Sequence, residues 1–223
     1  GATEAGRQAA AAHTAAMASP DRIIDGMLRQ AGVVRIAEYS HLVLAGKALA
    51  MLPLPRAKRV SFLAPSGAML AVLSDFCVRL GLAIPPLDPA TVGRLQAMSP
   101  AYIRMRNPVD IWPAATSSGV EFAYRQGMEI VLQDPAADAV VAVMMLTPET
   151  GVPDPGFIVE LAGKYPEKPI LVTFSGDKKC MDEYKEALEP KGIPTFPEIE
   201  QPFEALAILA RCREAMEQPH TGS

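Results

Sequence analysis

The stretch "DAVVAVMML", residues 138–146, decides the fold class of this chain. It shows no alternation between apolar and polar side chains, which is typical of a parallel strand covered on both faces. Beyond it, helical and strand patterns alternate with short connections. In order, these are predicted at 155–165 (helix), 168–176 (strand), 179–192 (helix), 193–196 (strand) and 202–216 (helix). Such alternation predicts a sheet of βαβ units with right-handed crossovers.

The residues before this stretch continue the same pattern. "KRVSFLAPSG" (58–67) is an apolar strand that runs directly into a Ser-Gly turn, and apolar residues continue at helical spacing from Met69 to Leu80. Residues 88–98 and 120–134 read as helices, and 99–119 as a long connection interrupted by prolines. The sequence therefore predicts an α/β fold, a flavodoxin-like doubly wound parallel sheet, over residues 55–218, with a tail at 219–223.

Residues 1–54 read as a partial α/β unit that precedes this domain. A helix is predicted over 20–31, a short strand over 33–36 and a second helix over 38–52. Along the second helix, one face is expected to hold the apolar residues Tyr39, Leu42, Val43, Leu49 and Ala50. One strand is too little to close a sheet, so we expect the chain to be a piece of something longer, with residues 1–18 poorly ordered.

Composition narrows the function classes. The 223 residues are 49% hydrophobic and 21% charged, with a net charge of -4 and no run of Lys or Arg, which argues against a nucleic-acid surface. The three cysteines form no C-x-x-C pair and no metal cluster, which favours buried thiols in a reducing compartment. No apolar run reaches the roughly 20 residues of a membrane helix, and no export signal is present. A cytoplasmic location away from membranes is expected.

One loop has the features of a phosphate site. Ligands of open α/β sheets bind beyond the carboxyl ends of the strands, so the loops after Leu63, Leu146 and Phe174 are the ones to inspect. In the first, Ser66 and Gly67 introduce a helix whose first amides are unpaired and lie at the positive end of its dipole. A single glycine at a strand-to-helix turn more often reflects ordinary turn geometry. Neither a G-x-G-x-x-G nor a Walker motif occurs.

His13 lies in the small-residue run "AAAAHTAAMASPD" (9–21). A histidine can serve as a base, a ligand or a nucleophile, and the flanking alanines leave room for a phosphoryl group on its ring. The alternative is a solvated histidine without a role. His41 is expected on the exposed side of its helix and His220 in the polar tail, both without a function.

The stretch "RNPVDIWP" (106–113) combines a restricted backbone with polar side chains. Asn107 precedes a proline and is held in an extended or turn conformation, and Asp110 can form local hydrogen bonds. Trp112, the only tryptophan, is expected to anchor packing. A rigid connection is the simplest interpretation.

Several segments, taken in order, resemble the nucleoside-diphosphate-forming acyl-CoA synthetases, which are relatives of succinyl-CoA synthetase. "GATEAGRQAAAAHTAAMA" is similar to the family stretch "GrSeaGarAAaSHTGalAG", and "RNPVDIWP" to "NPvDltg". "FLAPSGAMLAVLSDFCVRLGLAIPPLDPATVGRLQAM" resembles the Gly-rich stretch that opens a helix in the family's ligase domain. The resemblance covers essentially the whole chain.

The resemblance implies a reaction and a set of site residues. Acyl-CoA, ADP and phosphate would be interconverted with a carboxylic acid, CoA and ATP through a phosphohistidine, with Mg²⁺ present. His13 matches the phosphorylated histidine, and Asn107 and Asp110 match a supporting turn. The phosphate loop is matched by Ser66, Gly67, Ala68 and Met69.

The resemblance also implies partners and leaves an alternative open. A CoA-binding Rossmann domain and an ATP-grasp domain or subunit would complete the enzyme, a homodimer is possible, and this chain alone should not turn over. Ala15, Ala68 and Leu70 stand where the family commonly has glycine. These substitutions motivate a rival hypothesis, a non-catalytic module of the same fold for assembly or for sensing CoA thioesters. A flavin-binding relative is a further alternative, although the flavodoxin phosphate loop is missing.

Overall fold

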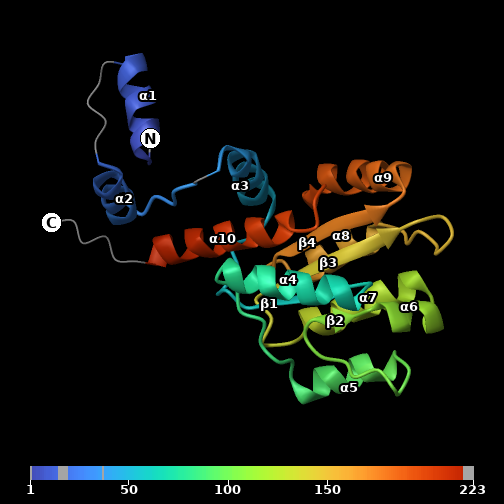
Figure 1. Cartoon of the computed structure of the whole chain (residues 1–223). Helices are drawn as coiled ribbons and strands as arrows, with labels where there is room; N and C mark the ends of the chain where they lie inside the picture. Colours follow the sequence, from blue (N-terminus) through green and yellow to red (C-terminus); the bar gives the residue numbers. More distant parts are fainter. Residues whose placement is uncertain (1, 15–19, 37, 218–223) are drawn as a thin grey trace.

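The computed structural model describes residues 2–14, 20–36 and 38–217, and its centre is a sheet of five parallel strands (Figure 1). The strands are β1 (Val60–Ala64), β2 (Val109–Asp110), β3 (Ala139–Leu146), β4 (Ile170–Gly176) and β5 (Thr195–Phe196). Their order across the sheet is β2-β1-β3-β4-β5. This is the flavodoxin-like doubly wound order, which confirms the predicted fold class.

Helices cover both faces of the sheet and make two separate cores. Val140, Ala142 and Met144 of β3 face one core, and Ala139, Val141 and Val143 face the other. The first core is closed by α5 (Pro89–Ala97), α6 (Trp112–Ser118), α7 (Val120–Leu132), α8 (Gly156–Lys164) and α9 (Lys178–Leu188). The second is closed by α3 (Tyr39–Met51), α4 (Gly67–Arg79) and α10 (Gln201–Glu217). Burial on both faces explains why β3 lacks alternation.

Residues 33–36 do not form the predicted strand. Helix α2 (Asp21–Gln30) ends with Gly32 at a φ of 69°, and Val33 donates a hydrogen bond back to Leu28 O at 2.8 Å. Residues 33–36 pair with no strand of the described chain, so their apolar side chains join no sheet. The predicted strand at 33–36 is therefore wrong, and the regular elements described within residues 1–54 are helices.

The expectation of poor order over residues 1–18 is wrong for part of that range. Glu4–Thr14 form helix α1, whose alanine-rich sequence favours the helix and whose first turn carries a Glu4–Arg7 ion pair. Within the predicted connection 99–119, the structure adds strand β2 and helix α6. Both are short, and neither leaves a periodic pattern in the sequence.

Helix α3 packs against the core with the face opposite to the one that the sequence predicts. Tyr39 is 88% exposed and Val43 is 76% exposed, whereas the buried residues are Leu44, Ala45 and Ala48. The small side chains of Ala45 and Ala48 allow α3 to approach α10 closely, and this contact sets the orientation. His41 is half-buried rather than exposed, with Nε2 3.3 Å from Glu204 Oε2.

A buried ion pair fixes the beginning of β3 against β1. Asp138 is 2% exposed and accepts from Arg59 Nε at 2.8 Å and from Arg59 Nη2 at 2.7 Å. The same carboxylate accepts from the Arg59 backbone amide at 3.2 Å.

In the described part of the chain, no helix is both long enough and apolar enough to cross a bilayer.

Candidate functional site: the start of helix α4

Helix α4 begins directly after the central strand β1. Ser66 has extended backbone angles and its side chain makes no capping hydrogen bond. Within the described residues, the amides of Gly67, Ala68 and Met69 find no acceptor, and the first amide bonded back into the helix is that of Leu70, at 3.0 Å from Ser66 O. Gly67 and Ala68 are exposed. The amides are therefore open to an anion at the positive end of the helix dipole.

Asp110 lies beside this helix start. Its strand β2 pairs with β1 so that Ala64 and Asp110 are register partners, and Ile111 N donates to Ala64 O at 3.1 Å. A β-carbon placed on Gly67 would lie 4.0 Å from Asp110 Oδ2, while Oδ1 accepts from Trp112 N at 3.2 Å. The structure thus brings Gly67 and Asp110 together. A fixed negative charge here stabilises the dipole and also competes with an incoming anion.

Asn107 holds the loop that carries Asp110. Its Nδ2 donates to Val60 O at 3.0 Å and to Pro85 O at 2.9 Å, and its Oδ1 accepts from Phe62 N at 3.3 Å. The bond from Asn107 to Pro108 is cis. All of its side-chain bonds end on backbone atoms, so Asn107 joins this loop to β1 and to Pro85. Trp112 is half-buried and packs against the first core.

Replacing Asn107 with alanine is expected to lower the free energy of unfolding by about 2 kcal/mol or more, because backbone groups of β1 and Pro85 lose their partner. Urea unfolding followed by circular dichroism measures the loss. Thr116→Ala is the control, since that exposed hydroxyl bonds only Pro113 O within α6, and it should change the stability by less than about 0.5 kcal/mol. Equal effects of the two substitutions would contradict the assignment.

A groove of about 460 Å³ runs along α4 beside this loop. It brings two arginines, which the sequence patterns did not single out, close to Gly67. Arg104 and Arg106 are exposed, and neither guanidinium forms an ion pair or hydrogen bond with any described residue. Their only signal in the sequence is their position just before the Asn-Pro pair. They supply positive charge that offsets Asp110.

Polar side chains in the loops after β3 and β4 form local hydrogen bonds. Thr147 Oγ1 and Thr150 Oγ1 lie 2.9 Å apart and bond within their own turn. Asp177 caps α9 by accepting from Cys180 N at 3.0 Å, and this hydrogen bond lowers the pKa of its carboxyl. These loops therefore stabilise local structure around the site.

His13 is exposed in the last turn of α1. In Figure 1, α1 lies apart from the sheet, on the side where α10 ends, whereas the arrowheads of the long strands point away from it. The structure therefore does not bring His13 to the start of α4. Ala15 and His220 lie outside the described residues.

The cysteines provide no nucleophile. Cys77 is fully buried in the second core, and burial raises the pKa of its thiol to about 12. Cys180 and Cys212 are half-buried, and burial raises their pKa values as well. Among the described residues, no cluster of His, Cys, Asp and Glu is arranged to hold a metal ion.

Comparison with known proteins shows what the chain is similar to. Residues 1–49 match the family model described as the succinyl-CoA ligase like flavodoxin domain. An acetate–CoA ligase [ADP-forming] II of Archaeoglobus fulgidus is 30% identical over 200 residues, which cover 89% of this chain and 29% of the relative. The α-subunit of acetate–CoA ligase [ADP-forming] II of Pyrococcus furiosus is 28% identical over 88% of this chain and 42% of the relative.

A solved structure shares the fold. The dinucleotide forming acetyl-coenzyme A synthetase 1 of Ca. Korarchaeum cryptofilum, in complex with phosphate and ADP, superposes with a TM-score of 0.82 at 23% identity. The superposition covers 96% of this chain and 46% of that structure, so this chain spans less than half of each protein it matches here. Over most of its length the chain is therefore similar to a part of the succinyl-CoA synthetase-like, NDP-forming acyl-CoA synthetases.

Proposed function

We propose that the chain acts in an ADP-forming acyl-CoA synthetase, in which it handles the phosphoryl group. Phosphate displaces CoA from an acyl-CoA to give an acyl phosphate, the phosphoryl group passes to His13 with release of the carboxylic acid, and ADP then takes it to form ATP. The observation that carries the proposal is the set of open amides at the start of α4 in a chain aligned over 89% of its length with an ADP-forming ligase.

The groove beside α4 has the charges that phosphoryl transfer needs. The amides of Gly67, Ala68 and Met69 hold the phosphoryl oxygens, and Arg104 and Arg106 supply mobile positive charge at the rim. Asp110 and Asn107 position the loop. Because the described residues contain no metal-binding cluster, Mg²⁺ enters as the partner of the nucleotide and not as a resident of this chain.

His13 must change place relative to the sheet to meet the α4 amides. Helices α1 and α2 expose most of their surface, and α2 has no buried residue, so little of the core opposes their displacement. Helix α3, in contrast, is anchored to α10 through Leu44, Ala45 and Ala48. This distribution of contacts supports movement of α1 and α2 about the segment that follows Gly32.

The remaining parts of the enzyme are a CoA-binding Rossmann domain and an ATP-grasp domain or subunit. Helices α2 and α3, and Val33 between them, expose large apolar side chains against which the first of these parts can pack. These residues are Ile23, Met27, Val33, Tyr39, Leu42, Val43 and Leu49. Large exposed apolar side chains are typical of a surface that packs against another domain. We call the chain with these parts the assembled enzyme.

The test is to incubate the assembled enzyme with ATP and Mg²⁺ and to locate the phosphoryl group by mass spectrometry. An acid-labile, base-stable adduct on His13 is expected, and it should be discharged by ADP. The same adduct should form from an acyl-CoA and labelled inorganic phosphate. A stable adduct on any other residue, or turnover with no adduct, would overturn the mechanism.

A non-catalytic module for assembly or CoA-thioester sensing is the second candidate. The Asp110 carboxylate beside Gly67 and the β-carbon of Ala68 favour it, since both reduce the access of an anion to the amides. Ala68→Gly separates the two functions. A catalytic site should gain phosphorylation when Ala68 is replaced, whereas a sensing module should bind thioester unchanged and show no adduct with either residue.

A further inference from the structure

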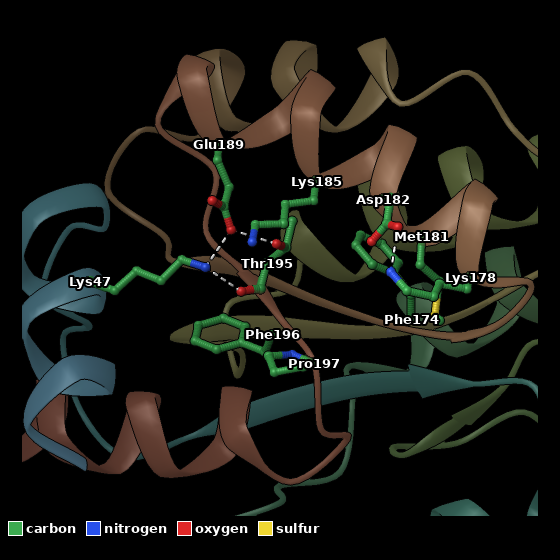
Figure 2. A pocket seen from close by; sticks show the side chains of 10 residues that line it. All are labelled: Lys47, Phe174, Lys178, Met181, Asp182, Lys185, Glu189, Thr195, Phe196 and Pro197. Carbon is green, nitrogen blue, oxygen red and sulfur yellow. Dashed lines mark hydrogen bonds and ion pairs between the residues drawn. The ribbon is translucent and has the colours of Figure 1, made fainter. Parts of the chain in front are cut away.

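A second cavity, of about 320 Å³, lies at the other edge of the sheet, where α3, α9 and the end of β5 meet (Figure 2). It is built from both parts of the chain, because Lys47 comes from α3 and the remaining lining residues come from β4 onward. Its size falls in the range of small-molecule pockets.

The floor of the cavity is apolar and rigid. Phe174 lies near the carboxyl end of β4 and is 6% exposed. Its ring packs edge-on against the Tyr184 ring, with the two centroids 5.1 Å apart. Phe196 ends β5 and Pro197 follows it, and Met181 adds a flexible thioether from α9. Such a floor accepts a flat or branched apolar body.

Lys47 is fully engaged and forms the wall on the α3 side. Its Nζ donates to Glu189 and to Thr195 O at 2.5 Å, and lies 5.6 Å from the centroid of the Phe196 ring. Thr195 Oγ1 donates to the same Glu189 oxygen at 2.6 Å. Burial raises the pKa of Glu189, but the hydrogen bonds from Lys47 and Thr195 outweigh it and leave the pKa below its ordinary value. Glu189 is therefore ionised and already neutralised by Lys47.

The charges around the cavity leave one lysine of the described chain, Lys185, without a hydrogen bond or ion pair, although its charge contributes to the lowered pKa of Glu189. Lys178 Nζ pairs with Asp182 Oδ2 at 2.5 Å, as Figure 2 shows. The Lys185 ammonium forms no ion pair or hydrogen bond with any residue that the structure describes. Three lysines face two carboxylates, so a single positive charge remains. A dianion such as phosphate would exceed this charge and be repelled by both carboxylates, whereas a monoanion neutralises the remaining positive charge.

We propose that this cavity binds a small monocarboxylic acid with an apolar body, whose carboxylate pairs with Lys185 and whose body lies on Phe174, Met181 and Phe196. The bound acid lies between α9 and the wall that Lys47 of α3 forms. The proposal goes beyond phosphoryl transfer and holds whether or not His13 is phosphorylated, because it concerns binding by this chain alone.

The test uses the chain labelled with ¹³C at its methionine methyl groups, with Met181→Leu to assign the Met181 signal. Phenylacetate is the probe, and phenylacetamide and inorganic phosphate are the comparators. Phenylacetate should shift the Met181 methyl signal saturably. Phenylacetamide should bind roughly five-fold more weakly, the size expected for loss of one partly exposed ion pair, and phosphate should leave the signal in place.

Lys185→Gln should remove the preference for the carboxylate while the fold is kept, because Lys185 is exposed on α9. The matched control is Lys191→Gln, an exposed lysine outside the cavity lining, which should retain the preference. Absence of a saturable Met181 shift, equal affinity of the wild type for the acid and its amide, or an unchanged preference in Lys185→Gln would each overturn the proposal.

Discussion

His13→Ala in the assembled enzyme is expected to reduce the phosphoryl adduct to the background of the assay and to abolish ATP formation. The proposed pathway has no second acceptor, since the cysteine thiols are buried or half-buried with raised pKa values. The imidazole is exposed in the last turn of α1 and packs against no core, so its removal should leave the stability of the chain unchanged. Loss of activity with an unchanged unfolding curve is therefore the expected pair of results.

His41→Ala is the matched control for this substitution. His41 is half-buried on α3, with Nε2 3.3 Å from Glu204 Oε2, so alanine should cost about 1 kcal/mol or less and leave the adduct intact. Retention of the adduct in His13→Ala would remove this residue from the mechanism. Loss of the adduct in both variants would instead indicate that the N-terminal helices act through their packing.

Local patterns were sufficient to predict strands β1, β3, β4 and β5 and the start of α4, but not strand β2. Strand β3 is apolar along its length because both of its faces are covered, and the run of consecutive apolar residues makes this visible in the sequence. The Ser66–Gly67 turn follows β1 without a spacer, so its place at the carboxyl edge of the sheet follows from the parallel topology. Both features depend only on residues that are neighbours in the sequence, so they can be predicted without knowledge of the fold.

Features that depend on distant residues could not be predicted in this way. The core-facing side of α3 is chosen by close packing of Ala45 and Ala48 on α10, and the periodicity of the larger residues indicated the opposite side. The Lys47–Glu189 contact joins residues that are 142 positions apart. Arg104 and Arg106 line the groove because β2 pairs with β1 and places their loop beside α4, and this pairing cannot be predicted from the local sequence.

Gly176→Ala is expected to destabilise the chain by about 3 kcal/mol or more. Gly176 ends β4 with a φ of 127°, in a region that side chains rarely adopt. A β-carbon there would overlap the carbonyl oxygen of Leu146 and come within 2.9 Å of Thr147 Cγ2. The same oxygen accepts from Asp177 N at 2.8 Å, so moving it aside would break the bond that leads into α9.

Gly163→Ala separates this steric effect from a general cost of adding a methyl group. Gly163 lies in α8 with no atom within 4 Å of its β-carbon position, so alanine should leave the stability unchanged or raise it by up to about 1 kcal/mol. Urea unfolding of the two variants beside the wild type measures the difference. A cost below about 1 kcal/mol for Gly176→Ala would mean that the β4–α9 turn can relax, and the rigid edge that supports Phe174 would then be an incorrect description.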